Sequence, residues 1–237
     1  MKALAIDTVA AACSVAICVN GETIFNNRIN MERGHAEVLI PMVIDAMSTS
    51  AIFFHELDLV AVTTGPGSFT GLRIGLSTAR TLSALARIPL IGVSSFDAVA
   101  SAIHWEVPRE STVVIALETK RDDVYVQLFD STLKHIEEPS AIPSENLKTF
   151  LIQRLVNRSN NLIIAGDCAK RAGKLIDAGG PCGLSISTFQ RGPDATEVAH
   201  LAIERFNPRE RYNPRNIQME AKPLYLRPAI LIPRTVD

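Results

Sequence analysis

The sequence is poor in the features that mark several large classes of protein. Its 24 Lys and Arg nearly balance its 25 Asp and Glu, so the net charge of −1 provides no global positive field for nucleic acid. No apolar run approaches the roughly 18 residues of a membrane span. The start of the chain reaches Asp7 too early for a signal peptide. We therefore expect a cytoplasmic globular protein that has no membrane partner and meets RNA only through other proteins.

The residue spacing of common metal sites is also missing. The four cysteines form no CxxC pair, and Cys13 and Cys18 are five residues apart on one predicted strand, which places them on opposite faces. We interpret these two, with Cys168 and Cys182, as buried apolar side chains. No two of the five histidines have metal-ligand spacing on one helix, and HExxH is absent. The sequence therefore predicts no intrinsic metal site.

One glycine-rich stretch, Thr63–Gly75, organises the first half of the chain. The apolar run Leu57–Val62 enters it and the helical run Leu72–Arg87 leaves it, so a buried strand leads into a turn that opens a helix. The stretch lacks the Gly-Lys-Ser/Thr ending of a P-loop and the spacing of a GxGxxG dinucleotide site. Two interpretations remain open: a tight turn whose glycines serve packing, or an anion-binding loop at a helix start. The second interpretation involves Asp7, Gly65, Gly67, Ser68, Thr70 and Gly71.

Ser68 and Thr70 are the hydroxyl side chains of this stretch nearest the helix start. Either residue is suited to cap the helix that follows. Neither has a histidine within motif range that would make it a nucleophile. We therefore predict no catalytic residue in the loop.

The order of predicted elements repeats once along the chain. The first part predicts strands 3–6, 12–19, 22–29, 57–62 and 89–93 and helices 33–47, 72–87 and 95–104. The second part predicts strands 112–117, 124–129, 133–137 and 162–165 and helices 144–156, 169–178 and 194–206, with Ser144 and Asp194 as caps. This order predicts an α/β protein with two ribonuclease-H-like lobes, 1–104 and 105–237, that face each other across a cleft. We expect an irregular tail from 205, with the last helix and segment 222–227 packing back on the body.

Two helices of the first lobe carry apolar residues around more of their circumference than a surface helix does. In helix 33–47, Ile40 and Ile44 widen a core stripe that runs from Val38 to Met47. In helix 72–87, the face opposite the core stripe is uncharged and consists of Ile74, Ser77, Thr78, Thr81 and Leu85. Two interpretations remain open: a partner covers these faces, or later segments of the same chain do.

Three stretches together resemble a known family. They are Leu4–Thr8 followed by Ala12–Ala16, His35–Met42, and Thr64–Gly75 continuing to Ile91–Ser95. They resemble the TsaB (YeaZ) family of bacterial tRNA threonylcarbamoyladenosine biosynthesis proteins. The resemblance is strong over roughly the first hundred residues and weaker at Ala116–Tyr125 and Leu224–Arg227. In the stretch Ala116–Tyr125, Glu118 replaces the family's usual Asp, and Asp123 replaces its usual Glu.

The resemblance implies a fold and a process. The fold is that of the actin/Hsp70/sugar-kinase superfamily, and the process is the attachment of threonylcarbamoyl to the adenosine beside the anticodon of tRNA. It also implies a non-catalytic member. The catalytic relative TsaD carries metal-holding histidines after its glycine loop, whereas Val93–Ala100 here contains none, and the second lobe shows only Gly166-Asp167-Cys168 in place of a long nucleotide loop.

The resemblance further implies partners for the two apolar helices. They would pack against a TsaD-like catalytic subunit in a four-helix bundle, or against a second copy in a homodimer when alone. It implies a TsaE-like ATPase, and ATP or ADP near that interface rather than an intrinsic cofactor. The implied interface residues are His35, Glu37, Ile40, Ile44, Arg73, Ile74, Ser77, Thr78 and Thr81, with Arg80 flanking them. We expect His35 to be a surface histidine at a helix end.

Three alternatives stay open from the residues alone. One is a small-molecule kinase or phosphotransferase of the same superfamily that uses Asp7, Gly65 and Gly67 around a metal-nucleotide. A second is a metallopeptidase, against which the missing metal histidines argue. A third is a homodimeric scaffold in another pathway.

Overall fold

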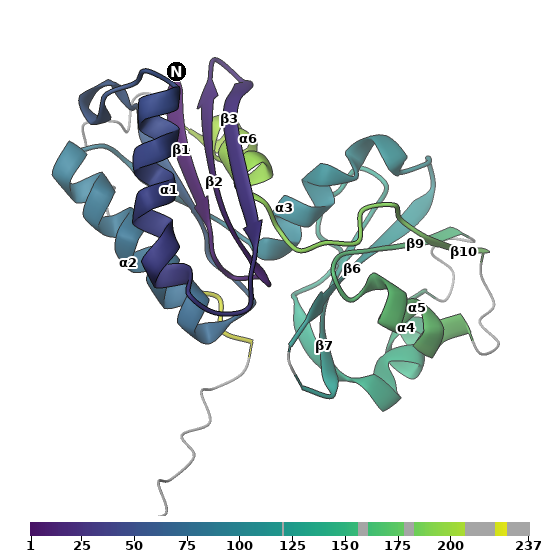
Figure 1. The fold of residues 1–237 in the computed structure, drawn as a ribbon. Coiled ribbons are helices and arrows are strands. Elements are labelled where there is room, and N and C mark those ends of the chain that lie inside the picture. Colours follow the sequence, from purple (N-terminus) through teal and green to yellow (C-terminus); the bar gives the residue numbers. More distant parts are fainter. Residues whose placement is uncertain (120, 156–160, 178–182, 207–220, 227–237) are drawn as a thin grey trace, which may run out of the picture.

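The computed structural model describes residues 1–119, 121–155, 161–177, 183–206 and 221–226. It consists of two α/β lobes, each built on a five-stranded sheet (Figure 1). Lys120 of a predicted turn, Val156 of a predicted helix, Cys182 and the tail segments 207–220 and 227–237 lie outside the described residues.

The first sheet has the strand order β3-β2-β1-β4-β5. Its strands are β1 (Lys2–Asp7), β2 (Ala12–Val19), β3 (Glu22–Asn30), β4 (Leu59–Thr63) and β5 (Leu90–Val93). Strands β1, β2 and β3 form an antiparallel meander, and β4 and β5 extend the sheet in parallel. Asn20 and Gly21 both have positive φ (52° and 87°), which matches the backbone that a two-residue hairpin turn requires.

Helices cover both faces of this sheet. One face carries α1 (His35–Thr49) and α2 (Phe69–Ala86), which lie side by side in Figure 1. The other face carries α6 (Ala195–Arg205), which comes from the end of the second lobe. Small side chains allow this helix to approach closely, because Ala195, Ala199 and Ala202 pack on alanines and Cys18 of the sheet.

The second sheet repeats the same order as β8-β7-β6-β9-β10. Its strands are β6 (Ser111–Glu118), β7 (Asp123–Phe129), β8 (Ser140–Pro143), β9 (Asn161–Ala165) and β10 (Gly183–Ile186). Helices α4 (Leu147–Leu155) and α5 (Ala169–Asp177) pack on one face. Helix α3 (Ser95–Ala102) packs Phe96 and Val99 into the core on the other face. The repeated topology confirms the predicted pair of ribonuclease-H-like lobes.

Helix α3 lies between the two lobes. Its Ala98 belongs to the core cluster of the first sheet and α6, whereas Phe96 and Val99 belong to the second lobe's core. Short 3₁₀ turns add connections at Phe54–Glu56, His104–Glu106 and Ser144–Asn146.

The start of α4 and the third strand of the second sheet differ from prediction. Residues 133–137 do not form a strand, because the Asp130 carboxylate accepts the backbone N–H groups of Thr132 and Lys134 and closes a turn. The sheet instead uses β8, and β10 was not predicted at all. Ser144 does not cap α4, since its hydroxyl accepts a hydrogen bond from Arg171 and a 3₁₀ turn precedes the helix.

The helices of the first lobe follow the prediction with shifted ends. Helix α1 begins at His35 because Gly34 before it takes a left-handed conformation (φ 89°). Pro41 lies inside α1, in its second turn. Helix α2 begins at Phe69, and the Ser68 hydroxyl accepts the backbone N–H of Gly71 at 3.2 Å, which confirms Ser68 as the cap.

The predicted burial of the cysteines is confirmed where the structure describes them. Cys13, Cys18 and Cys168 are free and buried. Cys13 and Cys18 belong to the core clusters on opposite faces of the first sheet. Among the described residues, no helix combines the length and apolar character needed to cross a bilayer.

Gly71→Ala should destabilise the protein, because an added Cβ would lie 2.0 Å from the backbone oxygen of Thr8. Neither backbone can move without disturbing the sheet, so we expect a loss of about 1 to 3 kcal/mol in chemical denaturation. The matched control is Gly173→Ala in α5, where the nearest atom is the end of the exposed Ile186 side chain at 2.7 Å. Equal effects of the two substitutions would contradict the close approach at Gly71.

Candidate functional site: an interlobe cleft and an outer helix face

The glycine loop after β4 rests directly on the turn between β1 and β2. Cβ atoms at Gly67 and Gly71 would lie 2.5 Å and 2.0 Å from the carbonyl oxygens of Val9 and Thr8. The backbone N–H of Ser68 donates to the Val9 carbonyl at 2.8 Å. Gly65 alone of these glycines has positive φ (96°). The loop therefore needs Gly67 and Gly71 for close approach and Gly65 for its backbone conformation.

Several N–H donors around this helix start are bonded within the protein. Besides Ser68, Gly71 donates its N–H to the Ser68 hydroxyl and Leu72 donates to the Ser68 carbonyl. Thr70 is exposed at the cleft. Because an anion at a helix start is held by free N–H groups, the bonds of Ser68 and Gly71 leave fewer donors for an anion at this loop.

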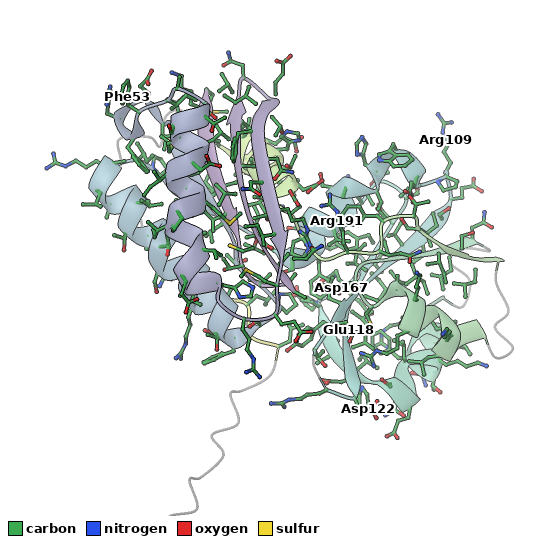
Figure 2. All side chains as sticks on the ribbon, viewed as in Figure 1. Phe53, Arg109, Glu118, Asp122, Asp167 and Arg191 are labelled. Atoms are coloured by element: carbon green, nitrogen blue, oxygen red, sulfur yellow. The ribbon has the colours of Figure 1, made fainter. Side chains whose placement is uncertain are left out.

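A cleft of about 830 Å³ separates the two lobes. The first lobe contributes Val9–Ala11, Glu32 and Pro66–Thr70, and the second contributes Leu117–Thr119, Arg121, Asp123, Tyr125 and Asp167. Figure 2 shows Glu118, Asp167 and Arg191 along the boundary between the lobes. Among the described lining residues, Arg121 is the only cation and faces a surplus of carboxylates.

The loops on the second-lobe side of the cleft are also hydrogen-bonded to neighbouring parts of the protein. The backbone N–H of Glu118 donates to the Asp167 carboxylate at 2.9 Å, and Gly166 and Cys168 donate their N–H groups to Phe189 and Ala116 carbonyls. Burial raises the pKa of Asp167. The acidic lining and these internal hydrogen bonds make this side of the cleft unfavourable for an anion.

Asp7 lies beneath the cleft rather than on its wall. It is fully buried, one carboxylate oxygen accepts the Val9 N–H at 3.5 Å, and the other has no hydrogen-bond partner among the described residues. Burial raises its pKa to about 7 and outweighs the lowering effects of Thr63 and Arg28. Asp7 is not among the lining residues of the cleft.

Arg28 joins β3 to the residues just before α6, a contact that the sequence analysis did not predict. From β3 it donates to the Pro193 carbonyl at 2.8 Å and to the Asp194 carboxylate at 3.3 Å. Arg191 donates to the same carboxylate at 2.9 Å. The available signal was a lone arginine in a polar edge strand, but its partner lies 166 residues away.

The outer face of α1 and α2 displays most of the predicted interface residues. Ile40 and Ile44 are 44% and 60% exposed, and Leu85 is 77% exposed. Glu37, Arg73, Ser77 and Thr81 are exposed, and Ile74 and Thr78 are half-buried. Within the described ranges, no later segment covers Ile40 or Ile44.

Of the residues predicted for this face, His35 is buried and Arg80 is hydrogen-bonded within the chain. His35 is only 6% exposed, so the prediction of a surface histidine is wrong: it begins α1 directly after the left-handed Gly34 and is turned into the protein. Its Nε2 atom has no hydrogen-bond partner among the described residues. Arg80 donates to the Ala221 carbonyl at 2.9 Å and is therefore held by the protein's own tail.

The family model described as "TsaD: tRNA N6-adenosine threonylcarbamoyltransferase" matches residues 24–197. The tRNA threonylcarbamoyladenosine biosynthesis protein TsaB of Escherichia coli K12 is 35% identical over 158 residues, which cover 65% of this chain and 68% of that protein. The chain belongs to the TsaB (YeaZ) family. TsaB of Haemophilus influenzae is 35% identical over 122 residues, covering 52% of this chain and 51% of that protein.

Solved structures agree on the fold. YeaZ from Pseudomonas aeruginosa superposes with a TM-score of 0.70 at 24% identity, covering 95% of this chain and 99% of that chain. An activator of 2-hydroxyisocaproyl-CoA dehydratase from Clostridium difficile gives a TM-score of 0.51 at 10% identity, covering 89% and 96%. These likenesses confirm the predicted two-lobed α/β fold. Within the described ranges, no group of three His, Cys, Asp or Glu side chains is arranged to hold a metal ion.

Asp7→Asn should stabilise the protein more at pH 8 than at pH 5. The folded-state pKa of about 7 lies above that of an unfolded Asp, so the stability that neutral Asp7 contributes is present at low pH and is lost as the pH rises through about 7. The amide stays neutral, so we expect its melting temperature to exceed that of the parent by a few degrees at pH 8. The exposed Asp45→Asn is the control, and the same shift at both pH values for Asp7→Asn would contradict the assignment.

Proposed function

We propose that this chain acts in tRNA threonylcarbamoyladenosine biosynthesis as a non-catalytic subunit that binds and activates a TsaD-like catalytic protein. The observation that carries the proposal is the uncovered outer face of α1 and α2, with Ile40 and Ile44 in its centre. Membership of the TsaB family supplies the process. With a net charge of −1, the chain meets tRNA through the complex rather than alone.

The outer face has the composition of a helix-packing surface. Ile40 and Ile44 are one helical turn apart, so their side chains form one apolar ridge on α1. On α2 the exposed Ser77 and Thr81 are small enough to let another helix approach. Glu37 and Arg73 place a charge of each sign at the edge. A pair of helices from the partner would bury the ridge, and a second copy would use the same face when the partner is absent.

The non-catalytic part of the proposal is supported by the residues after β5. Ser94 caps α3 with its hydroxyl, and Asp97 is held by His135 and Arg205 at 2.6 Å and 2.7 Å. This segment contains no histidine that could serve as an imidazole ligand. We propose that a TsaE-like ATPase, and ATP or ADP at the partner interface, complete the assembly.

A phosphotransferase is the rival that the geometry disfavours. Its nucleotide would have to enter the carboxylate-lined cleft, while Asp7, its proposed metal ligand, lies buried outside that lining. Titration calorimetry of the chain alone with Mg-ATP tests this rival, and saturable micromolar binding would revive it.

The double variant Ile40→Asp/Ile44→Asp should lose partner binding while the monomer stays folded. Both side chains are already about half exposed, so the charges cost little in the free chain but would be buried unpaired in the complex. We expect affinity for a TsaD-like protein to fall at least about 100-fold in titration calorimetry. The matched control is Ile152→Asp, a helical isoleucine of the second lobe that is 37% exposed. Undiminished binding by the double variant would refute the outer-face interface.

Reconstitution tests the function as a whole. Purified TsaD-like and TsaE-like proteins, the enzyme that forms the threonylcarbamoyl-adenylate, and tRNA are combined with or without this chain. We expect modified adenosine only when the chain is present and none from the chain alone. Equal product without it would overturn the proposed function and favour a scaffold in another process.

A further inference from the structure

Residues Ala221–Leu226, which form no helix or strand, run from the core under α1 and α2 past the start of α2 to the second lobe. The segment is anchored first at Ala221, which is 1% exposed and belongs to the core under α1 and α2. The guanidinium of Arg80 on α2 donates to the Ala221 carbonyl at 2.9 Å. This end of the segment is therefore fixed to the first lobe.

The middle of the segment is bonded to the glycine loop. Leu224 donates its backbone N–H to the Thr64 carbonyl at 2.7 Å. The Leu224 carbonyl oxygen lies 3.0 Å from where a Cβ of Gly65 would be. A side chain at position 65 would thus press on the segment, which gives this glycine a second role besides its positive φ.

The far end of the segment reaches the cleft and the second lobe. The Tyr225 ring lies 5.5 Å from the Phe69 ring, and the Arg73 guanidinium lies 4.0 Å above the same Phe69 ring. Leu226 packs against the core cluster of the second lobe. Leu224, Tyr225 and Leu226 also line the cleft. One short segment therefore touches the first-lobe core, the glycine loop, the first turn of α2 and the opposite lobe.

We propose that Ala221–Leu226 is a strap that fixes the width of the interlobe cleft and, through Phe69 and Arg73, holds the first turns of α2 in place. Leu226 supplies an apolar contact across the cleft, and Leu224 and Ala221 tie that contact to the first lobe. Loss of the strap frees the second lobe to rotate and loosens the aromatic and cation–π contacts at the start of α2. An effect of the strap on partner affinity rests on the proposed function; its effect on cleft width does not.

The test measures the distance between the lobes in the full-length chain by pulsed electron spin resonance. Spin labels are placed at the exposed positions Ser48→Cys on α1 and Gln153→Cys on α4, with Cys182→Ser so that labels attach only there. The strap variant is Tyr225→Ala/Leu226→Ala, and Lys222→Ala, exposed in the same segment, is the matched control. We expect one narrow distance distribution for the parent and the control, and at least a doubling of its width for the strap variant.

A second variant guards against a trivial loss of folding. Arg80→Met keeps the aliphatic stem of the side chain but removes the hydrogen bond to the Ala221 carbonyl, so it should broaden the distribution from the other end of the strap. Circular dichroism checks that each variant is folded. Narrow, unchanged distributions in both folded variants would overturn the strap.

The affinity of the variants for a TsaD-like protein provides an independent test. If the chain binds a TsaD-like protein, the strap variant should bind about tenfold more weakly, whereas Lys222→Ala should bind like the parent. If the parent itself does not bind, the proposed function fails, and the spin-label distances still decide whether the strap exists.

Discussion

The contact between the glycine loop and the β1–β2 turn is the constraint on which the rest of the molecule depends. Gly67 and Gly71 bring one backbone onto the carbonyls of Val9 and Thr8 at a distance that no side chain permits. This contact fixes where α2 starts and which way it runs across the sheet. It also uses the Ser68 N–H that a phosphate-binding loop would leave free. Gly67 and Gly71 of this loop therefore serve close packing.

The interlobe cleft and the outer face of α1 and α2 differ in their chemical character. In both lobes the loops that face the cleft bond to their own neighbours, and carboxylates dominate its walls. Part of the apolar surface that lacks cover within the described residues lies instead on α1 and α2, where Ile40, Ile44 and Leu85 are exposed. Burial of such a surface against another protein would be favourable, because it removes apolar area from water.

The sequence was most informative where the structure is locally determined. Helix faces, the Ser68 cap, the opposed Cys13 and Cys18 and the duplicated topology all follow from periodicity and turn chemistry. Prediction from the sequence failed where contacts between residues far apart in the chain determine the structure. The inward turn of His35, the pairing of Arg28 with Asp194 and the use of Ser144 by Arg171 depend on contacts that no local pattern reveals. Strand β8 was missed because Asp130 closes a turn where alternation suggested a strand.

The position of α6 has a consequence for the order of synthesis. One face of the first sheet, with Ala3, Ala5 and Ala16, is completed only by Ala195, Ala199 and Ala202 from near the other end of the chain. On the ribosome this face therefore stays open to water until nearly all of the second lobe has emerged. The N-terminal lobe, though translated first, therefore cannot complete this face until α6 has been made, when Arg28 can also pair with Asp194.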